Sequence, residues 1–379
     1  MAIDQQQKAT PDRQTVSLDE ALAYQQRILP EVSRTFALTI PQLPPELHPV
    51  IANAYLLCRI ADTIEDDPGL TPEDKSRFQA QFVAAIAGHE KPHAFAIELA
   101  SRLSAVTLPA ERELVANSAK VLRYTHTLDP LQRGALLNCV SIMCRGMGKF
   151  QRSASLAGLP TLNDLDQYCY FVAGVVGEML TELFCHYDRR IEARRDALVR
   201  LASAFGQGLQ LTNIIKDVWE DRARGVCWWP REVFAAEGIE LANLETARAQ
   251  KPFGRALGRL VGVAHGHLHH ALSYTLCIPR DQTGIRRFCL WAIGLAILTL
   301  QNVQQHHDYR QGGQVKVTRR RMWRMIRLVN FSSRSNWMLK RLFEWVARDL
   351  PYVEIDPGSL PSAWREPAAA AARHLAVNS

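Results

Sequence analysis

Apolar residues recur every three or four positions along most of the chain, a spacing typical of α-helices that bury one face. A first helix is expected to begin with "LDEALAYQQRIL", after Ser17 as N-cap and with Glu20 three residues further on. The same periodicity predicts helices at about 46–66, 71–87, 111–127, 131–151, 161–187, 194–224, 254–277, 283–308 and 318–348. No alternating run bounded by turns predicts a strand, so the chain is expected to be all-α.

Proline and glycine punctuate the ends of these segments, for example at Pro44-Pro45, Pro68-Gly69, Pro130, Gly158–Pro160, Pro230 and Pro279. No low-complexity linker divides the chain, which indicates a single domain over about 16–350. The polar residues 1–15 are expected to be a disordered N-terminus. Residues 351–379 are expected to form a loosely attached or disordered tail without a transmembrane helix.

The composition is that of a globular protein with a large core, because 47% of its 379 residues are hydrophobic. The formal net charge of +7 fits an anionic ligand or a membrane surface and does not by itself indicate nucleic acid. Eight cysteines are scattered without a CxxC pair, which is typical of reduced core thiols in a cytosolic protein.

We expect no signal peptide at the N-terminus. Its polar N-terminus lacks the apolar core of a signal peptide. The longest apolar run, "FCLWAIGLAILTL" at 288–300, is too short to span a bilayer and predicts a buried helix. We therefore expect a cytoplasmic protein, with peripheral association on the inner face of the membrane left open.

Two short stretches carry the same D-x-x-E-D spacing, which places their carboxylates on one face of a helix. The first acidic motif is Asp62, Glu65 and Asp66, and the second acidic motif is Asp217, Glu220 and Asp221. A single such pattern is expected roughly 0.1 times by chance in this length, and two far less often. One cluster alone would suggest a solvated helix end, but the repetition favours a site that holds a cation.

Gln210 and Asn213 precede Asp217 by seven and four residues, so they extend the second acidic motif into a polar stripe on an otherwise apolar helix. Carboxylates without nearby His or Cys suit Mg²⁺, which usually bridges to a phosphate. Two facing motifs could therefore hold Mg²⁺ ions and a diphosphate at the mouth of a helical cavity. A di-iron bundle is the competing metal site, but neither motif offers the Glu-x-x-His pattern that it needs.

Four stretches resemble the squalene and phytoene synthase family, the head-to-head prenyl synthases, and the squalene synthase branch most closely. They are "VSRTFALTI" (32–40), "YLLCRIADTIEDD" (55–67), "YCYFVAGVVGEML" (168–180) and "LQLTNIIKDVWEDRARGVCWWPREVF" (209–234), and a fainter match continues to "VKVTRR" (315–320). The resemblance implies a single-domain isoprenoid synthase-type helical bundle around a central cavity.

The resemblance also implies site residues. Asp62, Asp66, Asp217 and Asp221 would be metal ligands, with Glu65 and Glu220 supporting them. Substrate-binding residues would be Ser33, Arg34, Thr35, Phe36 and Arg59, together with Gln210 and Asn213 of the polar stripe and Lys216, which stands where many relatives have Arg. Tyr168 would act in the first half-reaction, and Tyr55 and Phe288 would join Phe36 as cavity aromatics.

The implied reaction joins two farnesyl diphosphates to presqualene diphosphate, which NADPH reduces to squalene, in the presence of Mg²⁺. No GxGxxG motif is present, and the resemblance points to Lys316 and Arg319 for NADPH. The neighbouring cluster of Arg319, Arg320 and Arg321 could hold the 2′-phosphate of NADPH, and it could equally be a solvated basic face or a membrane-surface patch. Thr318 and Ala292 depart from the squalene synthase pattern, so a synthase making presqualene diphosphate, dehydrosqualene or phytoene without reduction remains an alternative.

A hypothesis of another class is a basic nucleic-acid-binding or scaffold protein built on 319–327, but it leaves the doubled acidic motif unexplained. We therefore expect no nucleic acid and no obligate protein partner. The histidines of "HGHLHH" (265–270) and "HH" (306–307) have no Cys at zinc spacing and are expected to be surface or core residues.

Overall fold

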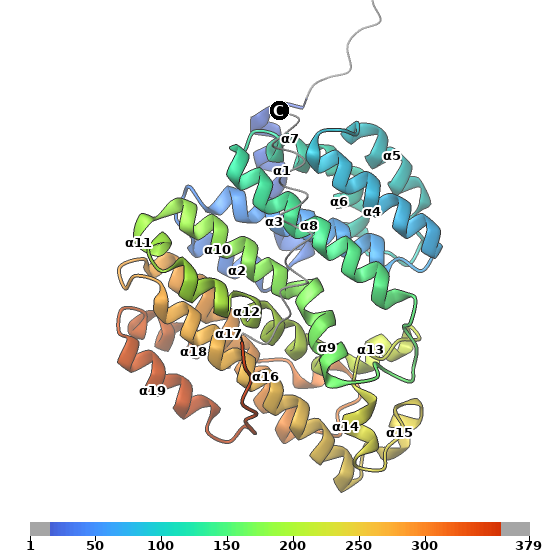
Figure 1. Ribbon diagram of the computed structural model, residues 1–379, viewed down its shortest axis with the longest axis vertical. Helices are drawn as coiled ribbons and strands as arrows, with labels where there is room; N and C mark the ends of the chain where they lie inside the picture. Colours follow the sequence, from blue (N-terminus) through green and yellow to red (C-terminus); the bar gives the residue numbers. More distant parts are fainter. Residues whose placement is uncertain (1–15, 358–379) are drawn as a thin grey trace, which may run out of the picture.

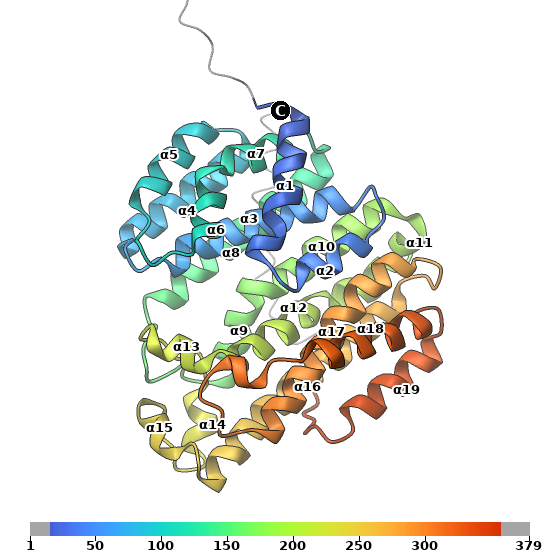
Figure 2. The same cartoon turned by 180° about the vertical axis from the view of Figure 1, so that it is seen from behind.

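Helices form nearly all of the regular structure in residues 16–357, the part of the chain that this computed structural model describes (Figure 1). A single isolated bridge joins Leu159 to Pro230, and this region contains no named strand. The prediction of an all-α fold is therefore confirmed, and the helices form one bundle in both views (Figures 1 and 2).

The first half of the bundle contains α1 (Leu18–Val32), α2 (Phe36–Thr39), α3 (His48–Asp66), α4 (Pro72–Ala87), α5 (Pro92–Arg102), α6 (Pro109–Ala116), α7 (Ser118–Thr125), α8 (Pro130–Gln151) and α9 (Leu162–Cys169). The second half contains α10 (Val175–Tyr187), α11 (Arg189–Glu192), α12 (Arg195–Lys216), α13 (Val218–Ala223), α14 (Arg231–Ala235), α15 (Leu244–Ala247), α16 (Lys251–Cys277), α17 (Thr283–Gln305), α18 (Arg319–Ser332) and α19 (Asn336–Ala347). Short 3₁₀ turns occur at Ile40–Gln42, Leu241–Asn243 and Gly312–Val315, and a π-helical turn occurs at Tyr170–Gly174.

The apolar periodicity located the long helices to within about three residues, as for α3, α4, α8, α16 and α17. The predicted N-cap is confirmed, because the Ser17 hydroxyl accepts a hydrogen bond from the backbone N–H of Glu20 at 3.1 Å.

Three predicted helices are in fact interrupted. The segment 111–127 breaks at Asn117, and 194–224 breaks at Asp217, whose φ of −100° and ψ of 14° leave the helical region. The segment 318–348 is two helices, because Ser335 starts α19 as an N-cap that accepts from the N–H of Met338. Helix α5 was not predicted at all.

Helix α12 lies at the centre of the bundle and packs on α10, α16 and α17. Glycines let the α10 segment approach it closely. A Cβ on Gly177 would lie 1.9 Å from the Ala202 carbonyl oxygen, and one on Gly206 would lie 1.9 Å from the Ala173 carbonyl oxygen. This backbone contact fixes α12, and α12 leads directly into the second acidic motif.

The predicted helix at 161–187 follows one path, but the π-helical turn at Tyr170–Gly174 interrupts its hydrogen-bond register. Thr161 and Asp164 form a capping box at its start. Such a turn adds a residue to the helix, and π-helical turns often lie at functional sites. Here the turn follows directly after Tyr168 and Cys169.

The first residues after 350 lie along α16. The N–H of Val353 donates to the Gly262 carbonyl at 3.1 Å, His265 contacts the Pro351 carbonyl at 2.9 Å, and His270 contacts the Ile355 carbonyl at 2.7 Å. The expectation of a loosely attached tail is therefore wrong for 351–355. The expectations for 1–15 and 358–379 lie outside the described residues.

Two helical stretches, Leu162–Tyr187 and Thr283–Gln305, are long and apolar enough to cross a membrane, but 67% of each apolar window is buried inside the protein. The core helix of a soluble protein meets the same criteria. The eight cysteines are free, and all except Cys277 are buried.

Candidate active site

Two acids of each acidic motif line one cavity, whereas Asp62 and Glu220 are not part of its lining. It has a volume of about 1850 Å³, and Glu65 and Asp66 of α3 share its wall with Asp217 and Asp221 at the end of α12 and on α13. Helices α4 and α8 complete the wall. The fold therefore brings together two carboxylate clusters that are about 150 positions apart in the sequence.

Arg224 links the two motifs across the cavity. Its guanidinium lies 3.6 Å from Asp66 and 2.5 Å from Asp221. The positive charge of Arg224 thus lies between carboxylates of both motifs, and Coulomb attraction stabilises it in this position. Sequence reasoning missed this arginine, although its position three residues after Asp221 was a usable signal.

One face of α3 carries Tyr55, Arg59, Asp62 and Asp66. Arg59 lies 3.8 Å from Asp62 and 2.7 Å from Glu111 of α6. Glu111 was also missed, because no local pattern connects α6 to α3. Arg59 is held between two acids, with its positive charge beside the first acidic motif.

Glu65 is buried, and its Oε1 has no hydrogen-bond partner. Its backbone carbonyl accepts hydrogen bonds from Lys75 and from Gln151, the latter at 2.6 Å. Burial, together with the charges of Asp66 and Asp62, raises the pKa of Glu65 well above its usual value. A buried carboxylate oxygen without a donor is expected where a cation completes the site.

Two other acids of the site, Asp62 and Asp221, also have raised pKa values. Burial is the main cause that raises the pKa of Asp62 to about 7, although about 30% of its side chain remains accessible, and Asp66 and Glu111 add to the shift. Burial likewise raises the pKa of Asp221 to about 6, with Asp217 and Asp66 contributing. A divalent cation would relieve this crowding and favour the ionised forms.

These donors fit Mg²⁺. Among residues 16–357, no three His, Cys, Asp or Glu side chains come close enough to hold a metal ion by themselves. Mg²⁺ does not need such a cage, because it keeps several waters and binds through one or two carboxylates and a substrate phosphate. The orphaned oxygen of Glu65 and the all-oxygen donor set agree with that mode.

Mg²⁺ is expected to raise the Tm of the protein more at pH 8 than at pH 5. In the metal-free protein the raised pKa values of Asp62 and Asp221 make the folded state bind more protons than the unfolded state between about pH 4 and 7. Their contribution to stability is therefore largest at low pH and is lost as the pH rises through 6 to 7. Mg²⁺ binds only the ionised carboxylates and restores stability above that window. Thermal unfolding with and without Mg²⁺ at both pH values tests this, and equal shifts would contradict it.

Asp67, the last acid of "DTIEDD", has a different role. It is buried and accepts hydrogen bonds from the N–H of Gly69 at 2.7 Å, from the N–H of Ser104 at 3.0 Å and from the Thr107 hydroxyl. Burial alone would raise its pKa, but these hydrogen bonds outweigh burial and lower it. Asp67 therefore ties the end of α3 to the loop that follows α5.

Asp67→Ala is expected to lower the free energy of unfolding by about 2–3 kcal/mol, because several buried donors lose their acceptor. The neighbouring Asp66→Asn is expected to change stability by less than about 0.5 kcal/mol, since Asp66 is exposed. Urea unfolding of both variants measures the difference. Equal stability of the two variants would show that Asp67 is not a structural acid.

A loop far along the chain covers the second acidic motif. The N–H of Gly312 donates to Glu220 at 2.9 Å, and a Cβ on Gly312 would lie 2.6 Å from Oδ1 of Asp217. The Tyr309 hydroxyl donates to the carbonyl of Ile215. The contact of Gly312 with the second acidic motif could not be predicted from the sequence, because local periodicity does not show which distant glycine lies against a helix.

The predicted cofactor residues, Lys316 and Arg319, lie where the same loop leads into α18. Lys316 and Arg319 are exposed at its end, whereas Arg321 is held by Gln301 at 2.9 Å and by Asn302. Lys216 lies 2.6 Å from Asp217. Two of the three clustered arginines, Arg319 and Arg320, are thus exposed at the surface, and neither forms an ion pair within residues 16–357.

Tyr168 lies between the motifs. Its ring stacks on Trp228 at 4.0 Å, and Phe150 meets it edge-on at 5.4 Å. Burial raises the pKa of Tyr168 well above its usual value, and the charges of Glu65, Asp66 and Asp221 add to the shift. The phenol is therefore neutral at pH 7 and close to both motifs. Trp228, which also lines the cavity, was missed despite the adjacent tryptophans in "VCWWP".

The predicted aromatics also come together. The Phe36 ring lies 5.2 Å from Tyr55 and 6.5 Å from Phe288. The Tyr55 hydroxyl donates to the Val32 carbonyl at 3.1 Å, and the Ser33 hydroxyl accepts from the N–H of Phe36 at 3.0 Å. These contacts hold the start of α2 against α3, one turn from Arg59.

The remaining predicted substrate residues have few fixed contacts. Arg34 is exposed in the bend after α1, and Thr35 precedes α2 without a side-chain cap. Gln210 is half-buried and Asn213 is exposed on α12, on the turns that lead to Asp217. Their side chains are available to a ligand.

Comparison with known proteins adds an independent finding. The sequence pattern of the squalene/phytoene synthase family matches residues 29–321. A squalene synthase of Eremothecium gossypii is 29% identical over 276 residues, which are 72% of this chain and 60% of that protein. One of Cochliobolus lunatus is 31% identical over 295 residues, which are 76% of this chain and 67% of that protein. The chain thus spans about 60% of the length of the first of these relatives.

A solved structure of TcSQS with the ligand E5700 is 25% identical, covers 95% of this chain and 100% of that chain, and gives a TM-score of 0.70.

Proposed function

Because the chain belongs to the squalene/phytoene synthase family, we propose that it joins two farnesyl diphosphates head to head and reduces the product, presqualene diphosphate, to squalene. The observation that carries this proposal is the convergence of two D-x-x-E-D motifs on one cavity with Arg224 between them. The similarity to named squalene synthases supports it.

In this proposal the metal ligands are Asp62, Asp66, Asp217 and Asp221, and Glu65 and Glu220 support them. Mg²⁺ bound there supplies positive charge to the diphosphate, which makes it a better leaving group. Glu65 contributes a carboxylate oxygen that no protein group uses. Glu220 holds the covering loop in place through Gly312.

The basic side chains of the site stabilise the departing diphosphate. Arg59 and Lys216 lie next to the acidic motifs and shift from their carboxylate partners to phosphate oxygens. Arg34 is exposed and adds a third cation. Arg224 can pair either with Asp66 or with the diphosphate. As the allylic C–O bond breaks, these charges favour the anion that forms.

The aromatic side chains protect the carbocation that remains. Phe36, Tyr55 and Phe288 pack together outside the lining of the cavity described above, and in this proposal their ring faces would stabilise positive charge without reacting as a nucleophile. Walls of packed side chains keep water away, since water would convert the cation to an alcohol.

Closure of the cyclopropane ring of presqualene diphosphate requires loss of a proton. Tyr168 is neutral, so it is a weak base. Its oxygen can still accept a proton from a carbocation if its own hydroxyl proton passes to the diphosphate. Tyr168 therefore acts as a relay, and the diphosphate is the final proton acceptor.

For reduction, Lys316 and Arg319 bind the phosphates of NADPH, which supplies the hydride when bound. The covering loop connects these residues to the second acidic motif through Gly312. We propose a cytoplasmic location with peripheral attachment to the inner face of the membrane.

The alternative function is condensation without reduction, giving presqualene diphosphate, dehydrosqualene or phytoene. Two observations favour this alternative, because each concerns a side chain that would otherwise be expected to bind NADPH. Arg321 is already held by Gln301 and Asn302, and Thr318 caps α18 by accepting from the N–H of Arg321 instead of contributing a cation.

Incubation of the purified protein with farnesyl diphosphate and Mg²⁺, with and without NADPH, tests the proposed function. We expect squalene with NADPH and presqualene diphosphate or its rearranged products without it. Identical products in both reactions would support the alternative, and no condensation product in either would overturn the proposed function.

A further inference from the structure

The helices α18 and α19 lie on one side of the bundle (Figure 2), and they expose large aromatic side chains. Trp323 is 52% exposed, Phe331 79%, Trp337 69% and Trp345 60%. A folded protein leaves such side chains in water at a cost, and their concentration on one surface indicates an interaction site. None of them has a part in the reaction proposed above.

The same two helices concentrate positive charge. Residues 319–348 contain nine Arg or Lys side chains and one acid, Glu344, and so carry a net charge of +8. The whole chain carries +7, so the other residues together are close to neutral. The excess charge of this protein is therefore a local property of α18 and α19.

Aromatic and basic side chains alternate on the outward faces of both helices. On α18 the inward positions Ile326 and Val329 are buried, and the opposite side carries Trp323, Arg327 and Phe331. On α19 Leu339 is buried, and the outward positions are Trp337, Arg341, Trp345 and Arg348. We call these outward faces the aromatic–basic surface.

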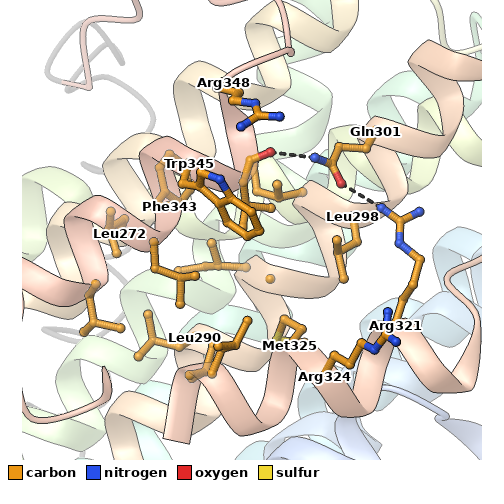
Figure 3. Close-up of a pocket in the computed structure, with 18 of the residues that line it drawn as sticks. Leu272, Leu290, Leu298, Gln301, Arg321, Arg324, Met325, Phe343, Trp345 and Arg348 are labelled. Atoms are coloured by element: carbon orange, nitrogen blue, oxygen red, sulfur yellow. Dashed lines mark hydrogen bonds between the residues drawn. The ribbon is translucent and has the colours of Figure 1, made fainter. Parts of the chain in front are cut away.

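An apolar groove opens between α18 and α19 (Figure 3). It has a volume of about 360 Å³, and its floor is formed by side chains such as Leu290, Leu298 and Met325. Arg324 and Arg348 lie at opposite sides of it, and Trp345 lies beside it. Asp349 also lines the groove and pairs with Arg348 at 3.3 Å, so the rim carries three arginines, Arg321 included, against one acid. The groove thus combines an aliphatic interior with a rim of net positive charge.

We propose that the aromatic–basic surface binds the surface of an anionic lipid bilayer, with a lipid acyl chain in the groove. Tryptophan prefers the membrane interface, and arginine binds phosphate headgroups while its stem lies along apolar groups. Charge complementarity with anionic lipids adds to the burial of the exposed rings. Nucleic acid matches the charge, but it offers nothing to fill an aliphatic groove.

This inference names the contact for the peripheral attachment proposed above, and it rests on no step of the reaction. Sedimentation of the full chain with vesicles tests it without substrate. One set of vesicles contains only phosphatidylcholine, and the other contains phosphatidylcholine mixed with phosphatidylglycerol. We expect binding to the mixed vesicles at least about tenfold tighter than to the neutral ones, and weaker binding at high salt.

Two double variants separate the contributions. Phe331→Ala with Trp337→Ala removes exposed rings, and Arg327→Glu with Arg341→Glu reverses two charges. Each is expected to weaken binding to the mixed vesicles by at least about tenfold. The matched control is Ile97→Ala with Lys91→Glu on or next to α5, on the opposite side of the bundle (Figure 1), and it should bind as the unmodified protein does.

Circular dichroism checks that each variant is folded. Equal affinity for neutral and anionic vesicles, or equal loss in the α5 control, would overturn the inference. So would a stable dimer that depends on Phe331 and Trp337, or salt-sensitive DNA binding tighter than binding to the mixed vesicles. Loss of binding in the two double variants of α18 and α19 alone, with squalene formation unchanged in detergent, is the result that supports it.

Discussion

Asp221→Asn is expected to lower kcat for condensation by about 1,000-fold. Asp221 lies on the cavity wall, 2.5 Å from the arginine that also approaches Asp66. Asparagine keeps the shape of the side chain but removes the charge that we propose binds Mg²⁺, and losses of this size follow when such a group is removed. Steady-state kinetics with farnesyl diphosphate at saturating Mg²⁺ measure the effect.

Asp196→Asn is the matched control, because Asp196 is an exposed acid in the first turn of α12, the helix that leads to the second acidic motif. It is expected to retain kcat within about twofold. If Asp221→Asn kept most of its activity while remaining folded, the second acidic motif would not be the metal site.

Tyr168→Phe is expected to lower kcat for presqualene diphosphate formation by about 100-fold, which is typical of a lost proton-transfer group. The ring keeps its stacking on Trp228, so the cavity wall is preserved. Only the hydroxyl, whose pKa is raised by burial and by carboxylates of both motifs, is removed. Rapid-quench measurement of the first half-reaction isolates this step.

Tyr124→Phe is the comparison, since burial alone raises the pKa of Tyr124 and no carboxylate contributes. This variant should keep the rate of the first half-reaction. An unchanged rate in Tyr168→Phe would leave the diphosphate as the only base and reduce Tyr168 to a packing residue.

The sequence allowed the fold class and the long helices to be predicted, because amphipathic periodicity repeats many times along each helix. It did not show the breaks at Asn117 and Asp217, where the backbone leaves the helix while the apolar spacing continues. The two helices of 318–348 were missed for a related reason, since apolar residues stand on both sides of the Ser335 cap.

The acidic motifs were predictable because the same spacing occurs twice, and the cavity that joins them agrees with that expectation. Their partners were not. Glu111 meets Arg59 from another helix, and Gly312 donates to Glu220 across 92 positions of sequence. Such contacts depend on how the helices are arranged in space. The role of Asp67 could not be predicted either, since this acid directly follows the first acidic motif but binds the loop after α5.

The central claim is that both acidic motifs hold one diphosphate through Mg²⁺. Calorimetric titration with inorganic pyrophosphate tests it most directly, using the unmodified protein, Asp66→Asn, Asp221→Asn and the double variant. We predict binding that requires Mg²⁺, a loss of at least about tenfold in each single variant, and little further loss in the double variant, since the two side chains share one ligand. Pyrophosphate binding that is independent of Mg²⁺, or unchanged in both single variants, would contradict the account.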